Sequence, residues 1–430
     1  MMRYLSNLKL VFQQRFITQN SYININILNG IALAIATNLV NPYYAKFAER
    51  MGATDYHIAY LNSLPAFVSL FALIPGAIFL DVFGSKMKNT TWMMLIHKLF
   101  FLIIAFIPII QGVSKPWLFI VLVALMNLPG AIYTMGYQSS IGDIFTARER
   151  GLAMGLRNRY SDIFRLGITL VSGILLSIPR NDNQVILLYQ IFFIASFAIG
   201  ILEVVSFSRF SVMTETQSHT EPDHIRRVWL AIQDSFRFSI TNKGFKQFMI
   251  ASLLFHFGWQ MGWPLFNIYT ITKLGANEAW LSAIAIAGGL TAILTATKWA
   301  RFADKKGNQI AAVVATFGMS TTPFLYVLSE SLTMLVVFNI LIGFSVTGTA
   351  LVLFNLLLEA TPKQNRTTII SIYNTVIAVS ATIAPVFGVW LMRQTSLEWS
   401  LIVTGLLRFV GCGAFWLGTR KKNDQGDSPH

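Results

Sequence analysis

The feature that most constrains the fold of this chain is a series of long apolar runs separated by short charged turns. A helix needs about 20 apolar residues to cross the ~30 Å hydrocarbon core of a bilayer, because each residue adds about 1.5 Å. Six runs of that length precede one long polar stretch, and six follow it. They occupy residues 22–47, 56–80, 91–111, 116–142, 151–177, 185–208, 246–271, 278–302, 310–328, 332–358, 366–392 and 397–419. We therefore expect an all-α membrane protein with twelve transmembrane helices.

Composition indicates that lipid is the solvent for most of the chain. Charged residues make up 12% of the 430 residues and apolar residues 54%, whereas roughly a quarter of an ordinary soluble domain is charged. The single cysteine, Cys412, lies in an apolar run, so no disulfide can form within the chain. Residues 1–21 are polar and basic, and the first apolar run is too long for a signal peptide, so we expect no cleaved leader.

The net charge of +14 could suggest a nucleic-acid partner, but the placement of the charges favours a membrane topology. With the N-terminus in the cytoplasm, the tails and loops on that side carry 21 Lys and Arg residues. The opposite side carries six, namely Lys46, Arg50, Lys115, Arg180, Lys273 and Arg393. Cytoplasmic loops of membrane proteins are enriched in Lys and Arg. We therefore expect both termini in the cytoplasm, contact with anionic lipid and no nucleic-acid binding.

The long polar stretch, residues 209–245, divides the chain into residues 1–208 and residues 246–430, each with six apolar runs. Its first part, Ser211 to Asp223, is rich in Ser, Thr and Glu and is typical of a flexible linker. Its second part is predicted to be an amphipathic helix on the cytoplasmic membrane surface; the alternative is a solvated linker. The apolar stripe of that helix comprises Ile225, Val228, Trp229, Ile232 and Phe236.

A short charged turn occurs at corresponding places in the two halves. Asp81 is followed by Gly84 and Lys86 between the second and third runs, and Asp304 is followed by Lys305 and Gly307 between the eighth and ninth. A second marker repeats with nearly the same spacing: Asp143 precedes Arg150 by seven residues, and Glu359 precedes Arg366 by seven. Two markers repeating at about half the chain length indicate a duplicated unit.

Six plus six helices, a cytoplasmic linker and this repeated turn resemble the major facilitator superfamily of secondary transporters. The family's turn reads Gly-x-x-x-Asp-Arg/Lys-x-Gly-Arg/Lys-Arg/Lys. In the first copy, Ala77, Val82 and Ser85 depart from that pattern, and in the second Ala300 and Asn308 do. The resemblance implies two six-helix bundles and a latch at a cytoplasmic gate, for which a plain topogenic turn is the alternative. The gate residues would be Asp81, Gly84, Lys86, Asp304, Lys305, Gly307, Asp143, Arg150, Glu359 and Arg366.

Two departures argue against the drug exporters of this family. Those exporters usually carry an Arg in the middle of the fourth helix, and residues 116–142 contain none. They also carry a Gly-x-x-x-Gly-Pro-x-x-Gly run in the fifth helix, which residues 151–177 lack. A partial version, with Ser380, Ala384, Pro385 and Gly388, lies in the eleventh run instead.

Ionisable groups are costly inside lipid, so each is a functional hypothesis. In the fifth run, Asp162 and Arg165 share one helical face, and Arg159 stands three residues before Asp162, where an ion pair can form. Arg165 could bind an anionic group of a substrate, or Asp162 could take a proton and release Arg165; a purely structural ion pair is the alternative. Lys98 is expected to extend to the membrane interface and Glu203 to lie near it, while Arg408 needs a partner that the sequence does not identify.

Polar and aromatic side chains on the runs that would line a central cavity form the candidate substrate site. Amides with flanking aromatic rings suit a polar or amphipathic organic solute. For each of these residues taken singly, a hydrogen bond between helices is the alternative, and His256 could also carry a proton. The candidates are Asn26, Asn29, Thr37, Asn127, Tyr133, Tyr137, His256, Trp259, Gln260, Trp263, Asn267 and Asn374.

Together these features predict a secondary active transporter of the cytoplasmic (inner) membrane. We expect it to move a small organic solute, anionic or zwitterionic, by proton-coupled alternating access, acting as a monomer. The alternatives are a proton-driven exporter of lipophilic compounds, a lipid flippase and, from other classes, a membrane enzyme or channel. The His residues are scattered, and neither a Cys pair nor a P-loop motif occurs, so we expect no metal, no cofactor and no enzymatic activity.

Overall fold

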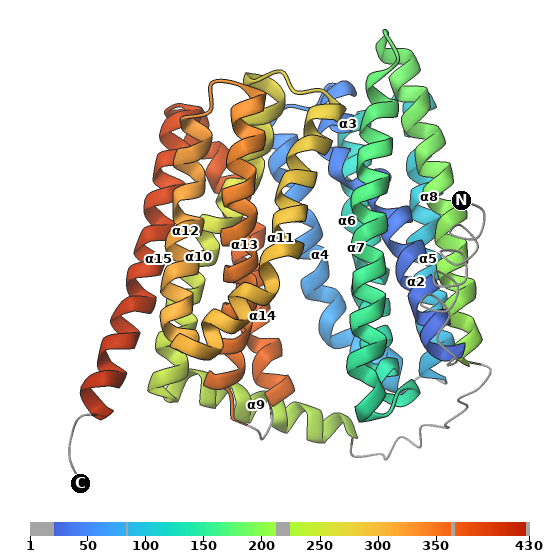
Figure 1. Cartoon of the computed structure of the whole chain (residues 1–430). Coiled ribbons are helices and arrows are strands. Elements are labelled where there is room, and N and C mark those ends of the chain that lie inside the picture. Colours follow the sequence, from blue (N-terminus) through green and yellow to red (C-terminus); the bar gives the residue numbers. More distant parts are fainter. Residues whose placement is uncertain (1–20, 83–84, 212–223, 363–365, 427–430) are drawn as a thin grey trace, which may run out of the picture.

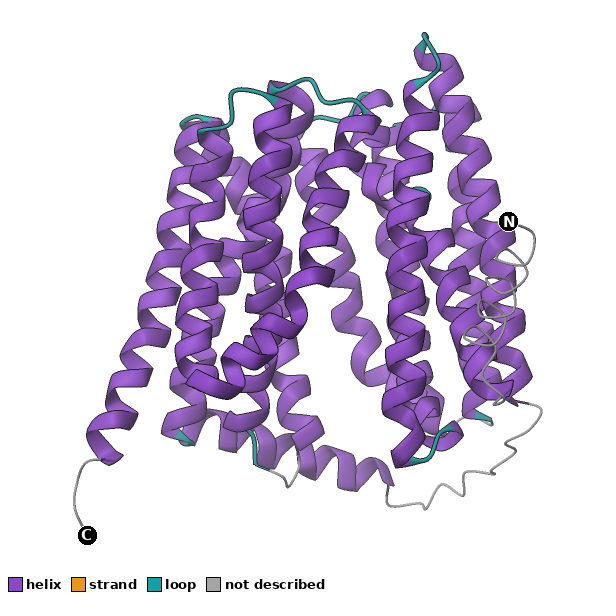
Figure 2. Ribbon diagram, in the orientation of Figure 1, coloured by secondary structure: helices purple, strands orange, loops and turns teal. Residues whose placement is uncertain are grey.

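The computed structural model describes residues 21–82, 85–211, 224–362 and 366–426, and every regular element in these ranges is a helix (Figures 1 and 2). The helices of the first half are α2 (Ser21–Asn38), η1 (Asn41–Tyr43), α3 (Tyr44–Arg50), α4 (Asp55–Val82), α5 (Lys86–Ala105), η2 (Ile107–Ile109), α6 (Lys115–Ile144), α7 (Ala147–Ser177) and α8 (Asp182–Ser211). Those that follow are α9 (His224–Thr241), α10 (Lys243–Ile268), η3 (Tyr269–Lys273), α11 (Glu278–Lys306), α12 (Asn308–Val327), α13 (Leu332–Ala360), α14 (Arg366–Gln394) and α15 (Leu397–Gly426).

The predicted membrane class is confirmed in its main feature. In the described ranges, 10 stretches are long and apolar enough to cross a bilayer. Each predicted apolar run coincides with a helix, but α4 and α10, with 28 and 26 residues, are not among the 10. In α10, His256, Gln260 and Asn267 interrupt the apolar sequence. The chain is therefore a multi-pass membrane protein.

The first apolar run is one helix in the sequence-based expectation, but it is broken in the structure. α2 ends at Asn38, a 3₁₀ turn with Pro42 follows, and α3 begins at Tyr44. Pro42 has no backbone N–H to continue a helical ladder, so an interruption at this point is expected. The break matters for function because Asn41 and Tyr44 both lie on the wall of the central cavity described below.

The helices pack in two groups. The first helix group, α2–α8, and the second helix group, α10–α15, each pack mainly within themselves. Contacts between the groups are made by α4 with α14 and α10, by α7 with α11, and by η1 with α11. In Figure 1 the helices of the two groups lie side by side at the end where α3 lies and spread apart toward the end where α9 lies. We refer to these as the α3 end and the α9 end.

α9 is the helix predicted in the polar stretch. It packs on α14 and α10 and runs across the α9 end (Figure 1). Of the predicted apolar stripe, the structure describes the side chain of Phe236, which is exposed. The predicted linker, Ser211 to Asp223, lies outside the described residues except for Ser211, the last residue of α8. The membrane-surface position of α9 stays a prediction.

Glycine allows α11 and α13 to approach each other closely. A Cβ added at Gly343 on α13 would lie 2.5 Å from the carbonyl oxygen of Gly288 on α11. Small residues at such crossings let helix backbones approach in membranes, where packing replaces the hydrophobic driving force.

We expect Gly343→Ala to destabilise the protein, because the new methyl group collides with backbone that cannot move aside cheaply. Overpacking of this kind costs about 1–3 kcal/mol. The measurement is the thermal unfolding midpoint of the purified protein in detergent. Gly413→Ala is the matched control, since a Cβ there meets nothing within 4 Å. Equal midpoints for the two variants would contradict the α11–α13 contact.

Candidate functional site

Two cavities adjoin each other: both helix groups line the first, and residues of the first helix group line the second. The first has a volume of about 520 Å³ and the second about 580 Å³. They share Asn41, Tyr44, Leu61 and Asn62, which come from the broken first helix and from α4. Volumes of roughly 300–1,000 Å³ are typical of small-molecule sites. Together the cavities form one central hollow, with one part facing each helix group.

The part facing the first helix group carries the charges, and all of them come from α7. Arg157, Asp162 and Arg165 line it. Arg165 donates to Oδ1 of Asp162 through Nε at 3.2 Å and pairs with it through Nη2 at 3.1 Å. Both side chains are partly exposed, so the pair faces the hollow rather than the interior of the bundle. Arg159 lies elsewhere: its side chain is exposed, and within the described residues Asp162 pairs with Arg165 instead.

The part facing the second helix group is polar but uncharged. Gln260, Trp263 and Asn267 of α10 line it together with Pro385 of α14. The side chain of Gln260 donates through Nε2 to the carbonyl of Ile377 at 3.3 Å, while its Oε1 atom is buried without a hydrogen-bond partner. Trp263 is half-exposed. Of the predicted cavity residues in the first helix group, Thr37, Asn127 and Tyr133 line the charged part.

The other six predicted cavity residues do not line these two cavities. Tyr137 donates to Asn26 Oδ1 at 2.7 Å, and Asn26 donates to the carbonyl of Ala153 at 3.3 Å, which joins α2, α6 and α7. Asn29 donates to the carbonyl of Glu203 at 3.1 Å. In these residues the amide and hydroxyl groups satisfy one another between helices, as buried polar groups must.

The remaining three residues lie on the second helix group. The imidazole of His256 hydrogen-bonds through Nδ1 with the carbonyl of Ser252 at 2.8 Å and stacks on Trp259, with ring centroids 5.5 Å apart. This is a packed histidine with a local backbone partner. Asn374 is exposed on α14 and does not line either cavity.

A buried ion pair lies behind the charged part of the hollow. Lys98 of α5 and Glu203 of α8 are fully buried, with Nζ and Oε2 2.7 Å apart. The expectation that these two residues reach the membrane interface is wrong. The sequence did contain a signal: Lys98 is the single Lys, Arg, Asp or Glu of the run 91–111, and Glu203 is the single one of the run 185–208. Two opposite charges inside a bilayer are tolerated best when they pair. Lys98 Nζ also lies 5.5 Å from the ring centroid of the cavity residue Tyr133.

The partners of Arg408 are backbone carbonyls. Its guanidinium donates to Gly258, Trp259 and Met319 at 3.0, 3.2 and 3.1 Å. Pro323, four residues after Met319, has no N–H, so the Met319 carbonyl has no partner within its own helix. Arg408 fills that place and ties together α10, α12 and α15.

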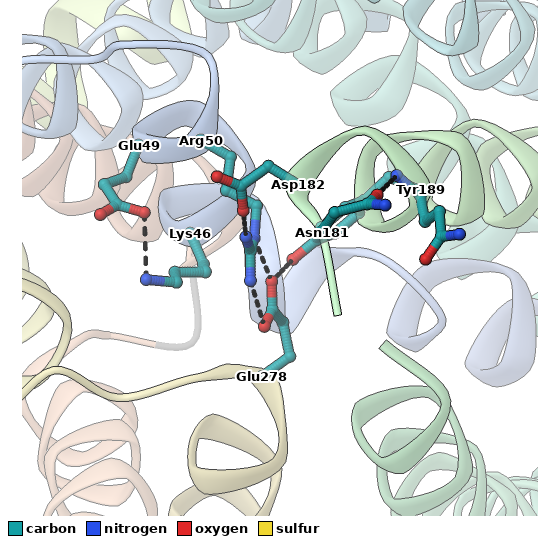
Figure 3. Close-up of polar contacts among 8 residues, drawn as sticks. Lys46, Glu49, Arg50, Asn181, Asp182, Tyr189 and Glu278 are labelled. Atoms are coloured by element: carbon teal, nitrogen blue, oxygen red, sulfur yellow. Dashed lines mark hydrogen bonds and ion pairs between the residues drawn. The ribbon is translucent and has the colours of Figure 1, made fainter. Parts of the chain in front are cut away.

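Charged contacts between the helix groups close the α3 end. Glu278, at the start of α11, is fully buried and accepts from Arg50 of α3 at 2.7 and 3.0 Å, as a bidentate pair, and from Tyr189 of α8 at 3.0 Å (Figure 3). Asp182 pairs with the same arginine. A bidentate guanidinium–carboxylate contact has a defined geometry and is stronger than a hydrogen bond between neutral groups.

Two further contacts support this closure. Arg393 of α14 pairs with Asp55 of α4 at 2.6 Å. The hydroxyls of Tyr43 and Ser282 lie 2.7 Å apart, and each lies within hydrogen-bond distance of the carbonyl of Thr169 of α7, so these three groups form one shared network. The contacts that close the α3 end therefore involve η1, α3, α4, α7 and α8 on one side and α11 and α14 on the other.

The residues predicted for a gate lie at the opposite, α9 end. Lys86 pairs with Asp143 at 2.6 Å, and Asn308 donates to Glu359 at 2.7 Å. Arg150 and Arg366 each donate to backbone carbonyls at the end of the preceding helix, with matching geometry in the two groups: Gly142 and Phe145 accept from the first, and Leu358 and Thr361 from the second. These contacts stay within one helix group.

The repeated turn itself is described only in part. Gly307 has a φ of 84°, the left-handed conformation that glycine adopts without strain. Asp304 and Lys305 are exposed. Gly84 and the side chain of Asp81 lie outside the described part of the chain.

Comparison with known proteins shows what the chain is similar to. The model of the Major Facilitator Superfamily matches residues 248–430, whereas a search of curated proteins found no match. Among solved structures, a point mutant of the nucleoside transporter NupG has a TM-score of 0.70 at 12% identity, over 92% of this chain and 100% of that one. A POT family transporter in complex with 5-aminolevulinic acid gives 0.69 at 12%, over 93% and 96%. A POT family transporter in complex with a thioalcohol-conjugated peptide gives 0.68 at 11%, over 93% and 96%.

At these identities the structural similarity establishes the fold. The fold and the family match together define a multi-pass membrane transporter. Residues 248–430 are similar to the Major Facilitator Superfamily, and the chain shares its fold with these solved transporters, in keeping with the resemblance that the repeated turn and the apolar runs indicated.

We expect Lys98→Met to lower the free energy of unfolding by about 3–5 kcal/mol, because it leaves the Glu203 carboxylate buried without its counter-charge. The measurement is thermal unfolding in detergent. The double variant Lys98→Met, Glu203→Leu should recover most of the loss, since it removes both charges together. A Lys98→Met protein as stable as the wild type would show that the pair does not form.

Proposed function

We propose that this protein is a secondary active transporter that moves a small organic solute, anionic or zwitterionic, by alternating access. In this proposal residues 1–208 and 246–430 form two six-helix bundles that cross the cytoplasmic membrane twelve times in total. Residues 209–245 connect them on the cytoplasmic side, where both termini lie. One observation carries the proposal: a polar hollow lies between two helix groups, and among the described residues the charged contacts between these groups lie at one end.

The distribution of charge gives the direction of the closed end. Lys46, Arg50 and Lys115 lie at the α3 end, which is the side poor in cations, and the cation-rich loops lie at the α9 end. In this proposal the closed α3 end is the outer side, and the arrangement described is an inward-open one. To open outward, the protein must break the Arg50–Glu278 and Asp55–Arg393 contacts, and the turn residues at the α9 end must then meet across the groups.

The two parts of the hollow support the choice of cargo. Amides and Trp263 on one side suit hydrogen bonding and stacking, and the arginines of α7 on the other suit an anionic group. Solved structures with this fold include a nucleoside transporter and transporters bound to 5-aminolevulinic acid and to a conjugated peptide, all small organic solutes.

Proton coupling is assigned to the Asp162–Arg165 pair. Protonation of Asp162 removes the charge that holds Arg165, and an arginine released into the hollow can attract an anionic cargo or reset the cavity. Because both side chains are partly exposed, a proton can reach the pair from the hollow without passing through packed protein.

The second candidate is a proton-driven exporter of lipophilic compounds or a lipid flippase. The lining of the charged part also contains Leu33, Phe101, Val123 and Met126, which would suit an apolar cargo. Flux that tolerates many neutral compounds and survives Arg165→Ala would favour this alternative.

The Arg50–Glu278 contact at the α3 end predicts how accessible the hollow is from outside the cell. We expect Glu278→Gln to raise labelling of a cysteine at position 62 several-fold when a membrane-impermeant thiol reagent is added outside intact cells, because Arg50 loses its charged partner across the groups. The background is Cys412→Ala, which removes the single native cysteine. Lys46→Gln is the control, since Lys46 pairs with Glu49 within α3. Unchanged labelling in Glu278→Gln would contradict the role of the Arg50–Glu278 contact in closing the α3 end.

The coupling pair predicts a loss of gradient dependence. In proteoliposomes, Asp162→Asn should abolish the stimulation of solute flux by a pH gradient while leaving exchange without a gradient, because an amide cannot titrate. Arg165→Ala should reduce flux at least ~10-fold, since one charged hydrogen bond corresponds to about that factor. Full gradient-driven flux in both variants would disprove this assignment.

A further inference from the structure

The charges that line the hollow do not balance. Within the described residues, its charged side chains are Arg157, Arg165 and Asp162, two cations and one anion. Asp162 is engaged by Arg165 at 3.1–3.2 Å. No carboxylate of the described chain lies within ion-pair distance of Arg157. One positive charge is therefore left without a counter-charge in the lining of the hollow.

Arg157 is nevertheless held in a defined position. Its guanidinium carbon lies 4.6 Å from the ring centroid of Tyr137, and its Nη2 atom donates to Asn29 Oδ1 at 3.4 Å. Asn29 is fixed in turn by the carbonyl of Glu203. Stacking against an aromatic face suits the planar guanidinium in particular. Neither the tyrosine ring nor the amide carries a negative charge, so these contacts position Arg157 without neutralising it.

The surroundings of Arg157 contain unused hydrogen-bonding groups. Arg157 Nε and Ser161 Oγ are both buried without a hydrogen-bond partner. The two side chains lie next to each other, since a Cβ added at Gly30 would fall 2.5 Å from both Arg157 Cγ and Ser161 Oγ. Both residues line the charged part of the hollow. Buried polar groups are rarely left unsatisfied, so this wall is equipped for a ligand that accepts hydrogen bonds.

We propose that Arg157, assisted by Ser161, is the receptor for a single carboxylate of the cargo. One unbalanced positive charge matches a carboxylate, whereas a phosphate monoester would bring about −1.5 to −2. The rest of the cargo then extends past Asn62 toward the neutral part of the hollow. This inference rests on the proposed transport function, and it leaves the Asp162–Arg165 pair free for the proton.

The test uses the purified full-length protein and matched pairs of probes. The probes are 5-aminolevulinate with its methyl ester, a dipeptide with its C-terminal amide, and benzoate with benzamide, each titrated by thermal shift and calorimetry. We expect the wild type to bind at least one carboxylate more tightly than the ester or amide that lacks it, by about 10-fold or more, as expected for a hydrogen bond to a charged group.

The variants separate the charge of Arg157 from general effects on the helix. Arg157→Gln should remove the preference for the carboxylate and leave binding of the uncharged probe benzamide unchanged, whereas Arg157→Lys should retain part of the preference. Gly30→Ala should weaken carboxylate binding, because the new methyl group displaces Arg157. Arg159→Gln is the matched control, since it removes an exposed arginine from the same helix and should keep the preference.

Three results would overturn the inference. The first is equal binding of both members of every probe pair by the wild type, which includes no binding at all. The second is a carboxylate preference that survives Arg157→Gln. The third is an equal loss in Arg159→Gln. Measuring solute flux in proteoliposomes distinguishes a failure of the Arg157 assignment from a failure of the proposed transport function. Translocation without carboxylate preference would disprove only the Arg157 assignment, whereas carboxylate binding without translocation would disprove transport.

Discussion

The constraint on which this structure depends is that a bilayer core cannot solvate a charge or an unpaired polar group. Each ionisable side chain inside the bundle must therefore have a partner. Lys98 has Glu203, Arg408 has three carbonyls, and Arg165 has Asp162. Arg157 is the exception, with an aromatic face and an amide in place of a carboxylate. The same rule explains why the polar residues of α10 lie on the wall of a cavity and not against lipid.

The features that sequence alone predicted are those with strong periodicity or repetition. The apolar runs gave the helices, and the repeated turn with its Asp143/Arg150 and Glu359/Arg366 markers indicated the family. Even the backbone contacts of Arg150 and Arg366 match between the two groups. These features are local or duplicated, so a single sequence contains enough information to find them.

The candidate site was predictable only in part. Polar residues that face the cavity and polar residues that face a neighbouring helix have the same helical spacing in the sequence. Gln260 and Asn267 line the hollow, while Asn26 and Asn29, equally polar and equally periodic, satisfy partners on other helices. Helical spacing gives the face of a residue but not what that face meets. Lys98 and Glu203 were misplaced for a related reason: pairing them requires knowing that α5 and α8 are neighbours, which spacing within one helix cannot show.

Among the described residues, the charged side chains that line the hollow all lie on α7, which bears on the roles of the two halves in the proposed transport cycle. An ionic cargo would be attached to the first half throughout a cycle, and the second half would offer it only neutral, exchangeable contacts. During the rocking motion the first half would keep its electrostatic contact with the cargo. The second half would move relative to the cargo without breaking such a contact.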